Sequence, residues 1–138
     1  SSISYTGNNR THMIRVPDPG RFELRLMDGS VNPYLLQAGV MAAGLDGINN
    51  KIDPGEPLFC NMYTDYKNYP NLPKLPDELE DSLNNLEDSK VLREAFGEKV
   101  ISSYVKLKKQ ELESFDKEER FDKRSSITAW EKINTLDC

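Results

Sequence analysis

The stretch Arg21-Phe22-Glu23-Leu24-Arg25-Leu26 alternates charged and apolar residues, a pattern typical of a β-strand with one face toward a core. Successive side chains of a strand point to opposite faces, so the two arginines and Glu23 would share one face. A guanidinium is a planar fork of donors that suits phosphate and carboxylate oxygens, and a carboxylate is a hard ligand for a divalent cation. The stretch therefore predicts a sheet whose polar face can bind a phosphate, a metal ion and an acidic substrate.

These charges also have a purely structural interpretation. Exposed cross-strand ion pairs are common and contribute well under about 1 kcal/mol each. The spacing alone favours such a ladder, and Arg10 and Arg15 allow the same interpretation. Four arginines within the first 25 residues, with no lysine among them, instead favour oriented recognition of phosphate or carboxylate groups.

Length and composition predict a single domain that is part of a longer protein. The chain has 138 residues, the size of one ordinary domain. Its mean hydropathy is -0.66, and its hydrophobic content of 37% is lower than the roughly 45–50% apolar residues of average soluble domains. The sequence begins at Ser1 without a methionine or a signal peptide, so we expect a missing piece upstream.

Charge and cysteine usage argue against several classes of protein. A net charge of -5 disfavours a nucleic-acid partner, and the arginine-rich start fits a small anionic ligand better. No apolar run approaches the roughly 20 residues of a membrane-spanning helix, so no membrane association is expected. Cys60 and Cys138 make no metal-ligand spacing, and such sparse usage fits a reducing, cytoplasmic environment.

The order of predicted elements indicates an α+β fold. Strand-like segments at 3–7 and 11–16 and a turn at 17–20 lead into the strand quoted above. Residues 1–27 are therefore expected to form a short antiparallel sheet that carries the arginines.

A mostly helical C-terminal half is expected after this sheet. Asn32 can cap and Pro33 can open a helix over 32–47, and its apolar residues on every side predict a buried helix. Residues 53–76 hold five of the eight prolines, which indicates an irregular, proline-rich arm.

Residues 77–138 have apolar side chains at helical spacing. Ser89 can cap a short helix that ends at Gly97, and a long amphipathic helix follows. Trp130 suggests a short final helix that packs within its own chain or against a partner, and Leu136 continues its apolar spacing.

Three other features are candidates for a functional site, but each has a simpler structural alternative. His12 has no second histidine, serine or cysteine at zinc or triad spacing, so we expect it to be structural. Residues 46–50 resemble a calcium loop superficially, but isoleucine stands where an oxygen ligand is required. Tyr63, in the proline-rich arm, is a modification site, a packing residue or an interface anchor, and the sequence does not choose among these.

Four segments resemble a known family in order and spacing. They are Asn9-Arg10 through Arg15-Val16-Pro17, Arg21-Phe22-Glu23-Leu24-Arg25, Asn32-Pro33-Tyr34-Leu35, and residues 43–57, AGLDGINNKIDPGEP. Together they resemble the C-terminal part of the catalytic domain of bacterial type I glutamine synthetases. The resemblance is specific over residues 1–65 and general afterwards.

The resemblance implies an ATP-dependent ligase that phosphorylates the γ-carboxyl group of glutamate and then lets ammonia displace phosphate, with Mg or Mn as cofactor. It also implies roles for five residues of this chain. Arg10 would contact the substrate, ATP and the transferring phosphoryl group, Arg15 and Arg21 the ATP phosphates, Glu23 the metal, and Arg25 the glutamate carboxylate.

Other implications of the resemblance concern regulation, assembly and completeness. Tyr63 matches the adenylylated tyrosine of some type I enzymes, although Met62 and Thr64-Asp65 differ from its usual surroundings. Two stacked hexameric rings, a homo-dodecamer, are implied for a full-length protein. The family's other metal ligands belong to upstream sequence, so this chain alone is expected to be inactive and to bind Mg or Mn weakly.

The nature of the amine is open at this point. A γ-glutamyl ligase using methylamine, a polyamine or another amine is the first alternative, because the matched residues handle ATP, metal and glutamate. A non-catalytic relative is the second.

Overall fold

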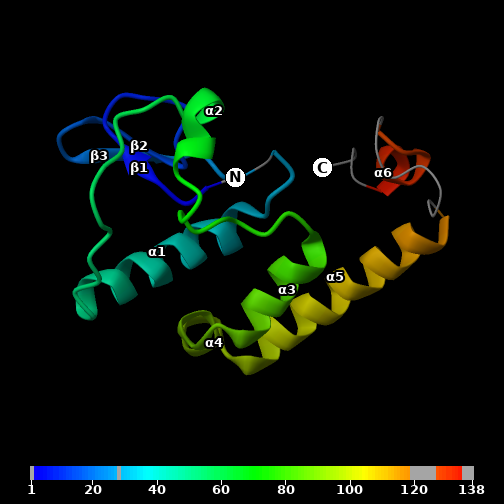
Figure 1. Ribbon diagram of the computed structural model, residues 1–138. Coiled ribbons are helices and arrows are strands. Elements are labelled where there is room, and N and C mark those ends of the chain that lie inside the picture. The colour runs from blue at the N-terminus through cyan, green and yellow to red at the C-terminus, as the bar shows by residue number, and fades with distance from the viewer. Residues whose placement is uncertain (1, 28, 119–126, 135–138) are drawn as a thin grey trace. The chain divides into compact units, whose positions relative to one another are not determined.

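The computed structural model describes residues 2–27, 29–118 and 127–134, and it confirms the α+β class (Figure 1). Short strands come first in the chain and helices dominate the rest. The elements, in order, are β1 (Tyr5–Thr6), β2 (Ile14–Asp18), β3 (Arg21–Leu24), α1 (Pro33–Asn49), α2 (Met62–Asp65), the single 3-10 turn η1 (Tyr66–Asn68), α3 (Leu79–Asp88), α4 (Lys90–Phe96), α5 (Glu98–Glu118) and α6 (Ala129–Asn134).

The chain groups into two compact units, where the sequence predicts one domain. Ser1–Gly29 and Ile52–Asp77 form the first, which we call the sheet unit. Ser30–Lys51 and Glu78–Cys138 form the second, the helical unit. The grouping arises because the chain leaves the sheet to make α1 and then returns to it with the proline-rich arm.

The sheet is mixed rather than wholly antiparallel. β2 and β3 pair antiparallel as predicted, with Arg15 opposite Glu23. β1 pairs parallel to β2, so the prediction of an antiparallel sheet is wrong for this strand. The reason is the segment between them, residues 7–13, which does not form a tight hairpin turn but brings the chain back to the start of β1.

The proline-rich arm contributes to the same unit. Its Leu58 amide donates to the Tyr5 carbonyl oxygen over 3.0 Å, and the Ile3 amide donates to the Pro73 carbonyl oxygen over 2.8 Å. The arm also contains α2, which the composition of this segment did not predict. Asn61 explains that helix, because its side chain accepts a hydrogen bond from the Tyr63 amide and so caps the first turn.

Two predictions of burial are wrong within the described chain. The apolar face of β3 was expected to be core, yet Phe22 is 61% exposed. No residue of α1 is buried, and Tyr34 at its start is 82% exposed. The predicted cap is present, since the Asn32 side chain accepts from the Tyr34 and Leu35 amides. A helix that is apolar on all sides needs partners on all sides, and α4 packs on only one of them.

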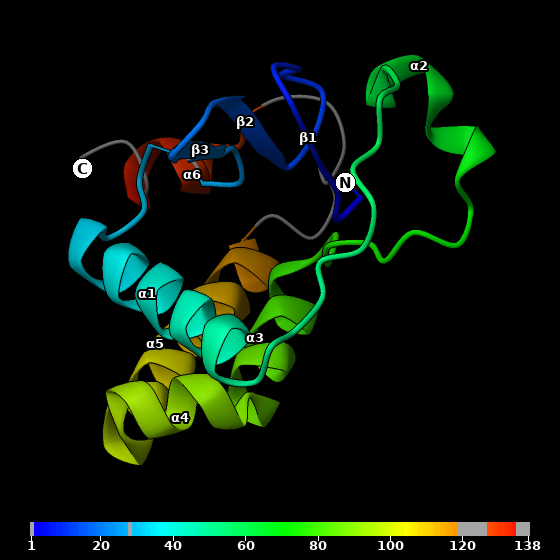
Figure 2. The ribbon, with the colours of Figure 1, turned by 90° about the vertical axis from the view of Figure 1, so that its left-hand side faces the viewer.

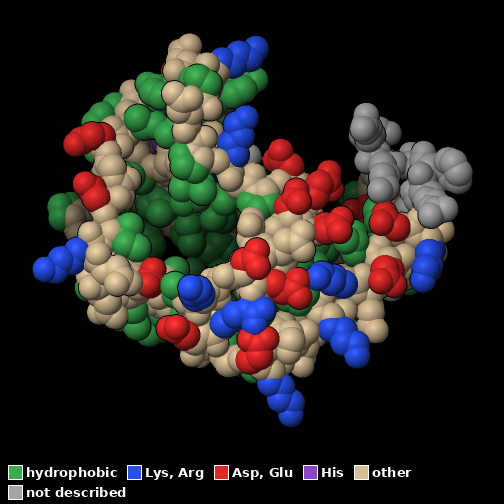
Figure 3. Space-filling view, turned by 60° about the horizontal axis from the view of Figure 1, so that its bottom comes forward, with side chains coloured by type: hydrophobic (Ala, Val, Ile, Leu, Met, Phe, Trp, Pro, Cys, Tyr) green, Lys and Arg blue, Asp and Glu red, His purple; other side chains and the backbone are tan. Residues whose placement is uncertain are grey.

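The core of the helical unit lies between α3 and α5, which Figure 2 shows side by side. Leu83, Ile101 and Val105 are buried there. Ser89 caps α4 through the Leu92 amide, as predicted, and Gly97 ends it at φ 84, a backbone angle that L-residues rarely adopt. Acidic and basic side chains are interspersed on the face of the molecule that Figure 3 shows. Within this unit, Lys109 Nζ and Glu87 Oε2 form an ion pair at 2.7 Å.

The final helix packs within its own chain. The Trp130 ring meets Phe115 edge to face at a centroid distance of 5.6 Å, and its Nε1 donates to Ser114 Oγ. Thr128 and Glu131 form a capping box, in which each side chain accepts from the other's amide. Leu136 and Cys138 lie outside the described residues. No helix of the described ranges combines the length and the apolar content needed to cross a bilayer.

Candidate active site

An ion-paired triad lies on the polar face of the sheet. Register places Arg15 of β2 opposite Glu23 of β3, and Arg15 Nη1 donates to Glu23 Oε2 over 2.7 Å. Arg25, one residue beyond the end of β3, donates through Nη1 to the other carboxylate oxygen, Oε1. The hydrogen bond from Arg25, followed by that from Arg15, lowers the pKa of Glu23 below its ordinary value. Glu23 is therefore an anion held between two cations.

Arg15 is the most firmly held arginine of the cluster. Its Nε donates to Asn8 Oδ1 over 2.9 Å, and Nη2 donates to the same oxygen. With Nη1 on Glu23, all three guanidinium nitrogens have partners. No sequence pattern indicates the contact of Asn8 with Arg15, because the two residues are seven positions apart.

Arg21 lies apart from the triad. Its Nη2 pairs with Asp18 Oδ2 over 2.6 Å at the β2–β3 turn, and both side chains are well exposed. Strand alternation still puts Arg21 on the same face as Glu23. The structure thus brings Arg15, Glu23 and Arg25 into contact and leaves Arg21 at the edge of that face.

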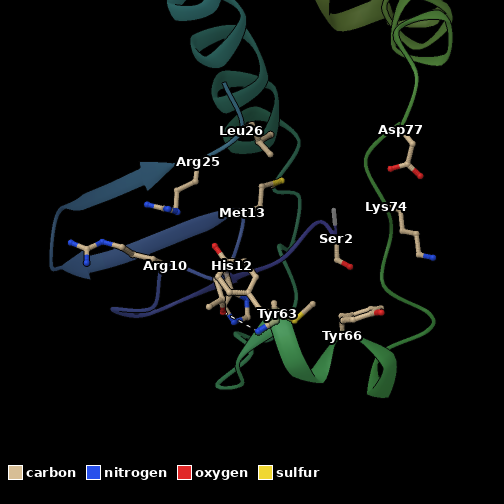
Figure 4. A pocket seen from close by; sticks show the side chains of 12 residues that line it. Ser2, Arg10, His12, Met13, Arg25, Leu26, Tyr63, Tyr66, Lys74 and Asp77 are labelled. Atoms are coloured by element: carbon tan, nitrogen blue, oxygen red, sulfur yellow. Dashed lines mark hydrogen bonds between the residues drawn. The ribbon is translucent and has the colours of Figure 1, made fainter. Parts of the chain in front are cut away.

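Arg10 and Arg25 line a pocket of about 390 Å³ in the sheet unit (Figure 4). In Figure 4 these two arginines lie on one side of the pocket, and Lys74 and Asp77 of the arm lie on the other. Arg10 is exposed and forms no hydrogen bond or ion pair with any other residue that the structure describes. Its guanidinium is thus free to bind a ligand.

Tyr63 also borders this pocket and is 72% exposed. Such exposure argues against a packing role within the described chain, and modification stays a prediction. Lys74 and Tyr66 were missed as lining residues. No local pattern could have found them, because the arm reaches residues 10–13 across some fifty positions of sequence.

The described residues do not make a metal site by themselves. Among residues 2–27, 29–118 and 127–134, no three His, Cys, Asp or Glu side chains gather in a way that could hold an ion. Both oxygens of Glu23 accept from arginines. Glu23 fits as one ligand of a metal whose remaining ligands come from elsewhere, and it does not fit as a complete site.

His12 is structural, as predicted. It is 2% exposed, and both ring nitrogens have partners: Nδ1 lies 3.1 Å from Ser4 Oγ and Nε2 lies 2.9 Å from the Cys60 carbonyl oxygen.

Comparison with known proteins decides the family. The model of the glutamine synthetase catalytic domain matches residues 1–131. The chain belongs to this family. It is 47% identical over 137 residues, 99% of its length, to a glutamine synthetase of Rhizobium meliloti (strain 1021), and this covers 30% of that protein. The family resemblance inferred from the sequence is therefore confirmed, and ligase is the enzyme class of the family.

One further relative is named for an amine other than ammonia, and a solved structure is similar to this chain as well. A glutamate–methylamine ligase of Methyloversatilis universalis is 44% identical over 113 residues, 79% of this chain and 25% of that protein. A solved GmaS–ADP complex is similar to 99% of this chain and 30% of its own, with a TM-score of 0.81 and 42% identity. The chain spans about 30% of the length of two glutamine synthetase relatives from Rhizobium.

Proposed function

We propose that this chain supplies the arginine-bearing part of the active site of an ATP-dependent ligase that joins ammonia to the γ-carboxyl group of L-glutamate. The triad of Arg15, Glu23 and Arg25 beside the pocket lined by Arg10 is the observation that carries the proposal. Two anionic substrates require fixed cations, and a paired carboxylate among them keeps these cations oriented.

The proposed reaction has two steps, a phosphoryl transfer and the displacement of phosphate by ammonia. An oxygen of the glutamate γ-carboxylate attacks the γ-phosphorus of ATP, the bond to the β-phosphate oxygen breaks, and ADP leaves. The nitrogen of ammonia then attacks the carbonyl carbon of γ-glutamyl phosphate, a C–N bond forms, and inorganic phosphate leaves as the nitrogen loses a proton. Charge spreads over phosphoryl oxygens in such transfers, so positioned guanidiniums stabilise the transition state.

The geometry suits the proposed roles to different degrees. Arg10, exposed at the pocket and unpaired within the described chain, suits contact with the substrates and the transferring phosphoryl group. Arg25 retains unused donors for the glutamate carboxylate, because Glu23 occupies one nitrogen only. Arg15 and Arg21 are assigned to the ATP phosphates, and binding there would require Arg21 to exchange Asp18 for a phosphate.

A divalent cation, Mg or Mn, would neutralise phosphate charge in this reaction. Glu23 is the residue of this chain assigned to hold it. Its low pKa keeps it ionised and so suited to a cation. Arg15 and Arg25 would then hold the carboxylate in place while an oxygen lone pair faces the metal.

A second candidate uses a primary amine in place of ammonia. The 44% identity to a glutamate–methylamine ligase supports methylamine, whereas the longer match at 47% to a glutamine synthetase supports ammonia. None of the assigned residues binds the nucleophile, so these residues serve either reaction.

Phosphate release by the full-length protein tests both candidates. The assay contains ATP, Mg and glutamate with ammonia, methylamine, ethanolamine or a polyamine, and omits glutamate as the control. We expect the highest kcat/KM with ammonia; a strong preference for a primary amine would replace ammonia by that amine. No phosphate release above background with any amine would support a non-catalytic relative. The 138-residue chain alone is expected to show no turnover.

A further inference from the structure

The loop of residues 9–12 is hydrogen-bonded to the arm through the neighbours of Arg10 rather than through Arg10 itself. We call these hydrogen bonds the fastening of the loop. Arg10 makes no bond with the other described residues, but the residues on either side of it bind the segment 60–62 of the arm. Asn9 Nδ2 donates to the Cys60 carbonyl oxygen over 2.9 Å, and the Met62 amide donates to Thr11 Oγ1 over 2.9 Å.

His12 completes this fastening from the buried side. A carbonyl oxygen can only accept, so the contact between His12 Nε2 and the Cys60 carbonyl fixes Nε2 as the protonated nitrogen. The Cys60 carbonyl thus receives two donors, from Asn9 and from His12. Nδ1 lies 3.1 Å from Ser4 Oγ, a contact separate from the one to Cys60.

The loop also braces itself internally. Asn9 Oδ1 accepts from the Thr11 amide over 2.9 Å and from the Thr11 hydroxyl over 2.8 Å. Three of the four residues from 9 to 12 are therefore held by side-chain hydrogen bonds. The fourth is Arg10, which lines the pocket (Figure 4). Because the backbone around Arg10 is already held, only the freedom of the Arg10 side chain is left to be lost when it binds a ligand.

We propose that His12 is the positioning residue for Arg10: its bond to the Cys60 carbonyl holds the 9–12 loop so that the Arg10 guanidinium meets the transferring phosphoryl group. This inference rests on the proposed function for what Arg10 contacts, but the fastening of the loop does not. Misplacement of a catalytic group by about 1 Å can lower a rate by about 10²-fold, so the bond affects the rate more than its own energy suggests.

Two substitutions distinguish the contact made by Nε2 of His12 from the contact made by Nδ1. His12→Asn keeps a polar group near Nδ1 and loses the reach to Cys60, whereas His12→Gln keeps a donor near Nε2. In the full-length protein we expect His12→Asn to lower kcat at least tenfold and His12→Gln to stay within threefold of the wild type. Ser4→Ala, which removes only the partner of Nδ1, is the control and should also stay within threefold.

A double-mutant cycle distinguishes positioning from general destabilisation. Arg10→Lys removes the guanidinium fork, so His12→Asn should lower kcat less than threefold when added to it. Losses that multiply fully in the double variant would overturn the positioning role. If His12→Asn does not fold, Thr11→Val, which removes the hydroxyl at nearly constant shape, takes its place in the same cycle.

Hydrogen exchange of peptides covering residues 9–13 and 60–62 gives a readout independent of activity. We expect faster exchange in His12→Asn and wild-type exchange in His12→Gln. Unchanged exchange in His12→Asn would overturn the fastening even if the protein proves to have no ligase activity. Absent ligase activity with the expected exchange would overturn the proposed function and the role of His12 in it, and would leave only the fastening established.

Discussion

Replacement of Arg25 by lysine tests the assignment of the glutamate carboxylate most directly. Arg25 lines the pocket and its Nη1 is taken by Glu23 Oε1, whereas its other donors have no partner among the described residues. Lysine keeps the charge but has three donors on a single nitrogen, and one of them would stay with Glu23. The substitution therefore removes the two-pronged contact and little else.

The expected size of the effect follows from the number of bonds lost. One hydrogen bond to a charged group contributes about 1.5–3 kcal/mol, and about 1.4 kcal/mol corresponds to a tenfold change in rate. Because the charge is retained, we expect the lower part of this range. The kcat/KM for glutamate should fall about 10- to 30-fold in the full-length enzyme, with the KM for ATP changed less.

A matched control is available in the helical unit. Arg93 also pairs with one carboxylate, that of Glu98, and the exposed fractions of the Arg25 and Arg93 side chains are 30% and 33%. Steady-state kinetics of Arg93→Lys should match the wild type within about twofold. Equal kcat/KM for glutamate in Arg25→Lys and the wild type would refute the assignment, as would an equal loss in both variants.

Two further predictions concern stability. The pKa of Glu23 is lower in the folded protein than in the unfolded chain, so ionised Glu23 stabilises the fold above about pH 4.3, and this stabilisation is lost as the pH falls through the folded pKa. The Tm measured from pH 6 to pH 3 should therefore fall less steeply in Glu23→Gln than in the wild type. Parallel Tm curves for the two proteins would contradict this. Leu83→Ala should lower the free energy of unfolding by about 2–3 kcal/mol, the lower part of the range for such changes, because the small core can partly collapse. Urea denaturation measures this loss, with Leu107→Ala, at a 54% exposed position, expected within about 0.5 kcal/mol of the wild type.

Local chemistry made several elements predictable. Asn32, Ser89 and Gly97 act through their own backbone neighbourhood, so the start of α1 and both ends of α4 could be predicted from residue type. The capping box of Thr128 and Glu131 has an equally local signal, which was overlooked. Burial was predicted less well, because apolarity shows that a surface needs a partner without showing where the partner is.

The candidate site was predictable only in part. Period-two alternation put Arg21, Glu23 and Arg25 on one face, and the structure joined two of these with Arg15 across the strand pair. Which arginine pairs with Glu23 depends on register, and register depends on the turn at residues 17–20 rather than on the strands alone.

The sequence by itself determined the family, the α+β class and the identity of the charged side chains, since all of these depend on residue type and spacing along the chain. Only the tertiary structure decided that Arg15 and Arg25 share Glu23, that Arg21 pairs with Asp18, and that His12 and Asn9 meet at the Cys60 carbonyl. The Arg15–Glu23 pair joins two strands, and the contacts to Cys60 join residues 48 and 51 positions apart; such contacts form only when the whole unit packs.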